Sequence, residues 1–139
     1  MNNISTNITY NNVVYSSTAT AKGIANIPNA EQLLNAEALA LKVLEPLISK
    51  FGKLIFNSWF RNKELNKAVK GSANSQHMTA QAVDIEVKAP YTNAQLFEHI
   101  KNNLPFDQLI WEKGTDKEPE WIHVSYSRIR NRKQILYIK

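Results

Sequence analysis

Two short stretches of the sequence contain the side chains best suited to chemistry. In residues 75–87, "SQHMTAQAVDIEV", His77 precedes Asp84 by seven positions, and the second half alternates as a half-buried strand does. A second strand-like run, "EWIHVSY", contains His123. Because side chains alternate along a strand, Asp84 and His123 can meet on an open, helix-free face if both strands share one sheet. His77 would reach them from the loop before the first strand.

Two imidazoles and one carboxylate would suit a catalytic zinc ion, because they leave a fourth tetrahedral position for water. Zinc lowers the pKa of such a water toward neutrality and makes it a usable nucleophile. A base is then needed, and Glu120 lies three residues before His123. Two residues three positions apart on a regular strand have side chains on opposite faces. Glu120 can therefore act beside His123 only if it lies in the turn before the strand, and the preceding Pro119 favours a turn there.

Spacing alone leaves ordinary alternatives open. A histidine on a strand is more often a surface or hydrogen-bonded residue than a metal ligand. Asp84 would equally serve as a cap or as the partner of a lysine, and a glutamate such as Glu120 near a hairpin is common. We interpret His99, within an expected helix, as a helix-surface residue.

Composition narrows the class of protein and the type of metal site. The 139-residue chain is 43% hydrophobic, which is typical of one globular domain. It has no cysteine, which excludes disulfides and thiolate ligands, so any metal must be bound by imidazole and carboxylate. The formal net charge is +5, with Arg128, Arg130, Arg132 and Lys133 close to the end. These cations suit any anionic polymer, or simply a solvated surface.

The first 22 residues are rich in Asn, Ser and Thr, and we expect them to form an arm or irregular lead-in before a single domain over residues 23–139. They lack the apolar stretch of a signal peptide, and no run in the chain is long enough to span a membrane. We therefore expect a soluble protein, made in the cytoplasm and carried or released to its site of action by other proteins.

The remaining pattern predicts an α+β fold. A long apolar periodicity over residues 30–51 indicates a helix capped by Asn29 with Gln32, kinked or divided at Pro46. Residues 53–60 form a strand, residues 62–69 a short helix, and residues 93–104 a helix capped by Thr92 with Gln95. Three further strands, at residues 107–112, 120–126 and 134–139, are expected to end the chain as an antiparallel meander, with "KGTDKEP" as a hairpin loop.

The motifs resemble those of the zinc D-Ala-D-Ala peptidases, a family that includes carboxypeptidases, dipeptidases and phage endopeptidases. "SQHMTAQAVDI" is similar to the family's Ser-x-His-x-x-Gly-x-Ala-x-Asp signature, "EWIH" to its Glu-x-x-His element, and "SWFRNKELN" to its upstream "SGYRS…LN" element. The resemblance covers residues 22–126. It implies the hedgehog/DD-peptidase fold, a small antiparallel sheet with helices on one face and a zinc cleft on the other.

Position by position, the resemblance implies one zinc ion bound by His77, Asp84 and His123. Glu120 would be the general base, and Arg61 would bind the scissile carbonyl and stabilise its oxyanion. Ser75 would help to bind the substrate. Ala80 replaces the family's glycine, and if that position needs a positive φ, the alanine costs about 1 kcal/mol of strain.

The implied function is hydrolysis of a peptide bond in the peptidoglycan stem, by a carboxypeptidase or an L-Ala-D-Glu-type endopeptidase resembling phage lysis or virion-associated enzymes. An alternative is a non-catalytic module that keeps the fold and binds wall peptide or a partner protein. Nucleic-acid binding through the terminal arginines has only charge in its favour. We expect no nucleic-acid or membrane partner and a monomeric chain.

Overall fold

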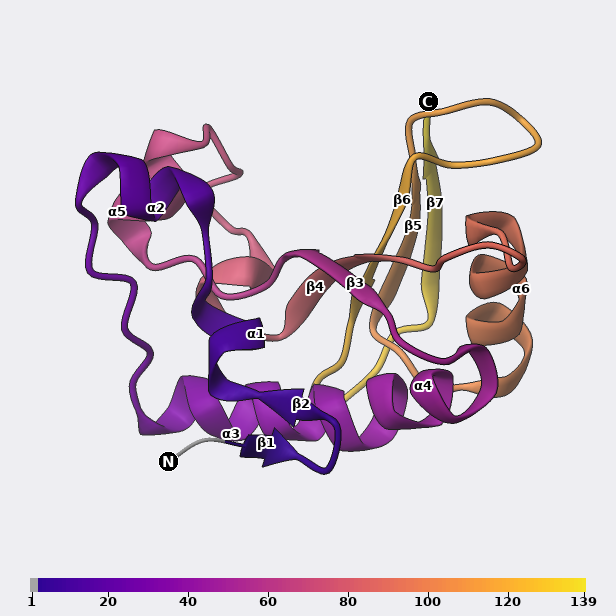
Figure 1. Ribbon diagram of the computed structural model, residues 1–139, viewed down its shortest axis with the longest axis horizontal. Helices are drawn as coiled ribbons and strands as arrows, with labels where there is room; N and C mark the ends of the chain where they lie inside the picture. The colour runs from indigo at the N-terminus through magenta and orange to yellow at the C-terminus, as the bar shows by residue number, and fades with distance from the viewer. Residues whose placement is uncertain (1–2) are drawn as a thin grey trace.

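The computed structural model describes residues 3–139, and its centre is a five-stranded sheet (Figure 1). The strand order is β3-β4-β6-β5-β7, and neighbours are antiparallel except for β5 and β7. Several helices accompany the sheet, so the predicted α+β class is confirmed. The strands are β3 (Ile55–Ser58), β4 (Ala82–Glu86), β5 (Gln108–Glu112), β6 (Trp121–Ser125) and β7 (Gln134–Ile138).

The last strand corrects the expected meander, because β7 pairs with β5 in parallel. β6 ends beside the start of β5, where the amide of Asp107 donates to the Ser125 carbonyl at 2.8 Å. The chain then crosses this end of the sheet, and the Gln134 amide donates to the Asp107 carbonyl at 3.0 Å. Since β7 leaves from the same end as β5, on its free edge, it must run in the same direction.

A long helical segment covers the apolar face of the sheet. It consists of α3 (Ala30–Leu39), a π-helical turn η1 (Ala40–Leu44) and α4 (Glu45–Phe51). The predicted capping box of Asn29 and Gln32 is present. The buried side chains of this helical segment form one cluster with residues at alternating positions of the strands. The helix α6 (Asn93–Asn103) packs into the same cluster, and it is capped by Thr92 and Gln95 as predicted. The strand residues in this cluster include Val83, Ile85, Leu109, Trp111, Ile122 and Val124.

Pro46, where the sequence predicted a kink or a division, interrupts the regular α-helical hydrogen bonding of the long helix without separating its two halves. It lies in the first turn of α4, directly after the π-helical turn. Proline has no N–H to donate to the carbonyl four residues earlier, and a first helical turn is where this loss is tolerated. The wider hydrogen-bonding of residues 40–44 keeps the two halves in one continuous rod (Figure 1).

The N-terminal segment is not an irregular lead-in over the described residues 3–22. It forms the hairpin β1 (Asn3–Ser5) and β2 (Ile8–Thr9) and the helices α1 (Tyr10–Val14) and α2 (Ser17–Lys22), and Ile4, Ile8 and Val13 belong to the main core. The polar composition misled the prediction because Thr9 and Ser16 act as helix caps. Met1 and Asn2 lie outside the described residues.

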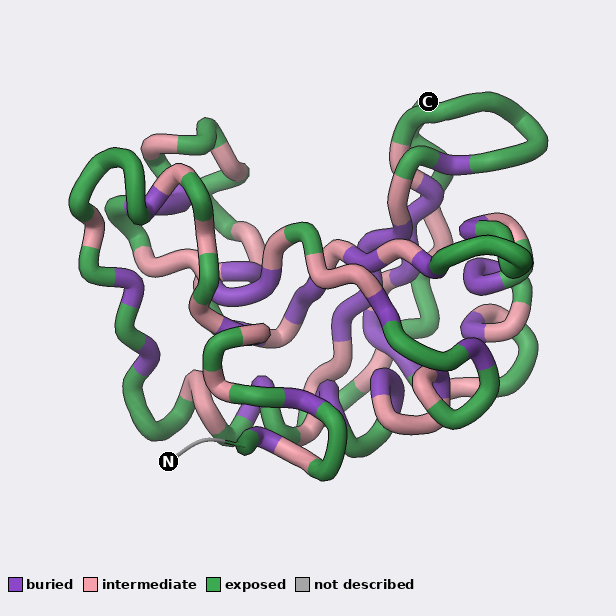
Figure 2. Tube along the Cα trace, in the orientation of Figure 1, coloured by how far each residue is buried: buried purple, intermediate pink, exposed green. Residues whose placement is uncertain are grey.

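Two short elements complete the chain: α5 (Lys63–Ala68) and the 3₁₀ turn η2 (Gln76–Thr79), which leads into β4. None of the helices over residues 3–139 is long and apolar enough to cross a bilayer. The loop between β5 and β6 projects beside the C-terminus (Figure 1) and is exposed along most of its length (Figure 2). It is the hairpin loop predicted from "KGTDKEP".

Gly114 should be the position in this hairpin least tolerant of a side chain. Its φ is +75°, and a Cβ there would lie 2.2 Å from the Glu118 carbonyl oxygen. Gly114→Ala combines backbone strain with a clash and is expected to lower the free energy of unfolding by about 2–4 kcal/mol in urea denaturation. Gly23→Ala is the matched control: its φ is +66° with nothing within 4 Å, so strain alone, about 1 kcal/mol, is expected. Equal losses in the two variants would contradict this.

Candidate metal centre

Asp84 and His123 face each other directly across β4 and β6. They are partners in the register of this antiparallel pair, and His123 Nδ1 lies 3.1 Å from Asp84 Oδ1. The residues on either side of them, such as Val83 and Ile122, point into the core. Asp84 and His123 therefore project from the opposite face of the sheet, as strand alternation predicted.

His77 reaches this pair from η2, the turn that precedes β4. The Ser75 hydroxyl caps η2 by accepting the His77 amide hydrogen at 3.1 Å. The His77 ring is buried, and its Nδ1 lies 2.7 Å from the carbonyl oxygen of Trp59. A carbonyl only accepts, so Nδ1 carries the proton and the lone pair is on Nε2, which lies 3.4 Å from Asp84 Oδ2.

The three side chains fit a metal ion. One ligand atom from each of them lies within 4.8 Å of the others. Ligand atoms on a tetrahedral zinc with bonds of 2.0–2.1 Å are about 3.3 Å apart. His77 Nε2 lies 3.4 Å from Asp84 Oδ2, and His123 Nδ1 lies 3.1 Å from Asp84 Oδ1, so each ring approaches one carboxylate oxygen at close to that distance. The donor set, two imidazoles and one carboxylate, is typical of zinc sites that keep a free coordination position.

Electrostatics keep Asp84 ionised despite its environment. Burial on its own would raise the pKa of the Asp84 carboxyl, but the adjacent His123 and His77 rings lower it, with a net result well below the usual range. An ionised carboxylate is the state that binds a cation. Asp84 is thus ready for a metal without first losing a proton.

Arg61 and Ser75 lie next to this cluster. The Arg61 amide donates to the His77 carbonyl at 3.0 Å, and its Nη2 donates to Ser75 Oγ at 3.3 Å. Burial lowers the pKa of Arg61, and the Asp84 carboxylate opposes this shift. Among the described residues, Arg61 Nε is one of three buried side-chain polar atoms without a hydrogen-bond partner, and Trp121 Nε1 is another. Both are N–H donors, which suits a substrate carbonyl or oxyanion.

These side chains line a single cleft of about 710 Å³. It contains the three candidate metal ligands together with Arg61, Ser75 and Trp121, and a volume of this size is typical of small-ligand sites. A second cavity of about 610 Å³, lined by Ile27, Phe60 and Met78 among others, holds none of the metal-binding side chains. The first cleft is therefore the candidate active site.

Glu120 does not join the cleft. It meets the condition of lying outside the regular strand, one residue before β6, but its side chain is exposed and absent from the cleft lining. Its amide donates to the Glu112 carbonyl at 3.0 Å across the hairpin. Glu112, which the sequence reasoning missed, lines the cleft instead.

Glu112 shares the open face with His123. Ile110 is the cross-strand partner of His123, and Glu112 is two residues further along β5, so it points the same way. Its side chain is half-buried, and burial raises the pKa of the Glu112 carboxyl, an effect that nearby His123 opposes and Asp84 reinforces. The signal that could have found Glu112 is the alternation of β5 in register with β6.

Ala80 occupies the position of the family's glycine, and its φ is +64°. The position therefore does need a left-handed conformation, which costs an alanine about 1 kcal/mol. Its methyl group is fully buried in the core cluster, which offsets part of that strain. The backbone at Ala80 still places its carbonyl to accept from Trp59 Nε1 at 3.0 Å.

The terminal cations do not form one free basic patch. Arg128 pairs with Glu31 and Asn35, and Arg132 pairs with Asp107. Arg130 is exposed. Two of the three arginines are thus engaged within the protein, which weakens the charge argument for a nucleic-acid surface.

Comparison with known proteins agrees with the geometry. No curated protein matches the chain. A family model described as Peptidase M15 matches residues 6–125, which covers β2 to β6 and every side chain of the metal cluster. M15 peptidases are zinc-dependent, and a His-Asp-His cluster able to hold a metal lies within the matched range. The chain belongs to the peptidase M15 family.

Proposed function

We propose that this protein is a zinc peptidase that hydrolyses a peptide bond in the stem of bacterial peptidoglycan. The observation that carries the proposal is the convergence of His77, Asp84 and His123 in one open cleft. Family membership implies a peptidase and supports peptidoglycan peptides as the substrate class. The basic net charge of +5 favours approach to anionic wall polymers.

His77 Nε2, the Asp84 carboxylate and His123 Nδ1 would hold the metal. When bound, zinc lowers the pKa of a coordinated water and polarises a carbonyl. The proton of His77 stays on Nδ1, held by the Trp59 carbonyl, so the ring is oriented before any metal binds.

Arg61 would bind the scissile carbonyl and stabilise the negative charge that develops on its oxygen. Arg61 is half-buried, its Nη2 donates to Ser75 Oγ, and its buried Nε–H has no hydrogen-bond partner among the described residues and is available to an acceptor in the cleft. A fixed cation in a site shielded from water stabilises a developing charge more than it would in solvent. Ser75, which holds both Arg61 and η2, would position the substrate-binding side of the cleft.

The proton from the attacking water must pass to the leaving amine through a carboxylate. The motif assigns this role to Glu120, whereas the cleft contains Glu112. The two residues are neighbours across one hairpin, so they form a matched pair for substitution. We propose Glu112 as the proton carrier, because it is a half-buried carboxyl in the cleft lining whose pKa is affected by both His123 and Asp84. Glu120 is the candidate that the motif indicates.

Carboxypeptidases and endopeptidases differ in whether the end of the cleft is blocked or open, which decides whether the stem peptide can extend past the cleaved bond. We propose a role in phage lysis or in the virion, acting on the wall after delivery by other proteins, because the family that the chain resembles includes phage endopeptidases of this kind. We propose a monomer as the working form.

The test is zinc-dependent release of amino groups from purified peptidoglycan. We expect new free amines at neutral pH, none in the presence of a chelator, and recovery when zinc is restored. Mass spectrometry of the muropeptides would identify the bond. Retention of the protein on the wall with no new amines in the presence of zinc would instead support a non-catalytic binding module.

A further inference from the structure

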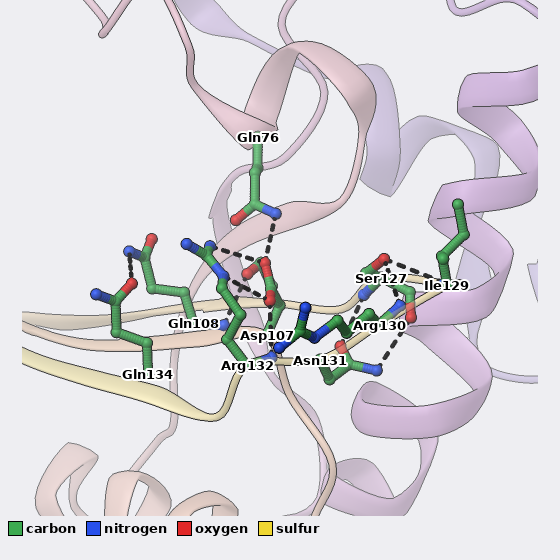
Figure 3. Close-up of polar contacts among 10 residues, drawn as sticks. Gln76, Asp107, Gln108, Ser127, Ile129, Arg130, Asn131, Arg132 and Gln134 are labelled. Atoms are coloured by element: carbon green, nitrogen blue, oxygen red, sulfur yellow. Dashed lines mark hydrogen bonds and ion pairs between the residues drawn. The ribbon is translucent and has the colours of Figure 1, made fainter.

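An ion pair between buried Asp107 and exposed Arg132 lies at the edge of the cleft. Asp107, the residue before β5, is only 4% exposed, and each of its carboxylate oxygens accepts two hydrogen bonds from N–H donors (Figure 3). Gln76 and Arg132 converge on it from different elements. Oδ1 accepts from Arg132 N and Nε, and Oδ2 accepts from Arg132 Nη2 and Gln76 Nε2, each at 2.9 Å.

This contact fixes Arg132 while leaving part of it free. The guanidinium uses two of its five N–H groups, on Nε and Nη2, which leaves three without a hydrogen bond to residues 3–139. Its side chain is 52% exposed and lines the same cleft as His77, Asp84 and His123. The edge formed by Nη1 and Nη2 is thus open to a ligand and held in one orientation.

A carboxylate is the ligand that fits this edge. Two parallel N–H groups match the two oxygens of a carboxylate, and such charge-assisted pairs are among the strongest hydrogen bonds in proteins. The hydrogen bond from Arg132 lowers the pKa of Asp107 to about 2, so the pair stays ionised at neutral pH. Lys70 and Arg61 also line the cleft and add to its positive potential.

Arg132 differs from the other arginines of the C-terminal segment. Arg128 donates to Glu31 and Asn35, and neither it nor Arg130 lines the cleft. Arg132 also lies after residue 125, where the family match ends. Its presence in the cleft depends on the crossover that leads to β7, which brings the end of the chain to Gln76, the residue next to the metal ligand His77.

We propose that Arg132, held by Asp107 and Gln76, binds a free carboxylate of the substrate beside the metal centre. The inference rests on the proposed function, since it names the substrate group that this cleft recognises. A peptidoglycan stem of the lysine type offers two such groups, the C-terminal carboxylate and that of its D-glutamate. Both have the chemistry that Arg132 requires.

Three synthetic peptides separate the two sources. They are the stem peptide L-Ala-γ-D-Glu-L-Lys-D-Ala-D-Ala, its C-terminal amide, and the form with D-isoglutamine in place of D-glutamate. Affinity is measured by calorimetry in the presence of a chelator, which prevents turnover, and KM and kcat are measured on the zinc-loaded protein. For the native protein, we expect one of the two modified peptides to bind about 10- to 100-fold more weakly than the unmodified one.

Arg132→Gln should remove this preference, so that all three peptides bind with the lower affinity, with the loss appearing in KM more than in kcat. Arg130→Gln, which removes the same charge two residues away, should keep the preference. Arg132→Lys retains the charge but not the paired N–H edge, and it should lose most of the preference even if the glutamine variant does not fold.

The inference would be overturned if the native protein did not distinguish the peptides, or if the Arg132 variants kept the preference. Arg132 would then serve only to hold the segment before β7 against Asp107. Failure of the proposed function gives a different result. A protein that cleaves none of the peptides but still prefers the free carboxylate through Arg132 would refute the peptidase and leave the carboxylate site standing.

Discussion

Asp84→Ala is expected to abolish zinc binding and to lower kcat/KM on peptidoglycan peptides by on the order of 10³-fold. Asp84 contacts both histidine rings, at 3.1 and 3.4 Å, so its loss removes one ligand and the carboxylate that lies between the other two. A metal supplies several kcal/mol of transition-state stabilisation, and about 1.36 kcal/mol corresponds to a factor of ten in rate. Zinc content by mass spectrometry and peptide hydrolysis are the measurements.

Glu86→Ala is the control for this variant. Glu86 is an acid on the same strand and face, two residues further on, and it bonds to Asn57 rather than to the histidines. It should keep about one zinc per chain and near-native activity. An Asp84→Ala protein that folds, keeps its zinc and still cleaves peptide would contradict the assignment of Asp84 as a ligand.

Glu112→Gln should bind zinc normally but lose about 10²- to 10⁴-fold in kcat, the range typical of general acid–base catalysis. The change keeps the shape of the half-buried side chain and removes only its ability to take a proton. Glu120→Gln should have a much smaller effect, because that side chain is exposed outside the cleft. Zinc content, circular dichroism and steady-state kinetics on the two variants give the comparison.

The reverse pattern, in which Glu120→Gln is inactive and Glu112→Gln is not, would return the role to the residue that the motif indicates. It would also mean that the hairpin loop rearranges when substrate binds, since Glu120 would have to enter the cleft. Retained zinc in the inactive variant is essential to either result, because loss of the metal would explain inactivity without a base.

The parts of the fold that follow from local pattern were predictable. The capping boxes at Asn29 and Thr92 mark the starts of α3 and α6, and alternation in β4 and β6 puts Asp84 and His123 on one face. Their meeting also requires that the two strands be neighbours, which alternation alone does not specify. The motif resemblance supplied that pairing.

The errors have two physical causes: polar side chains that cap short helices, and contacts between distant parts of the chain. Residues 3–22 look like an arm because their Ser and Thr side chains are polar, yet these residues cap short helices while Ile4, Ile8 and Val13 enter the core. The parallel placement of β7 depends on the bonds at Asp107, which join residues far apart in the sequence.

The same reasoning applies to the two cleft residues that the sequence did not reveal. Glu112 looks like an ordinary end of an apolar strand, and only its register with β6 shows that it shares a face with His123. Arg132 looks like one of several terminal cations, and only its bonds to a buried aspartate distinguish it. Neither the strand register at Glu112 nor the contact between Arg132 and Asp107 can be predicted from hydrophobic periodicity or from motif spacing.

The most direct measurement is anomalous diffraction at the zinc absorption edge from crystals of the purified protein. We expect one peak per chain, about 2.0–2.2 Å from His77 Nε2, a carboxylate oxygen of Asp84 and His123 Nδ1. A zinc-supplemented crystal with no anomalous peak between these three side chains, or with its peak elsewhere, would contradict the account.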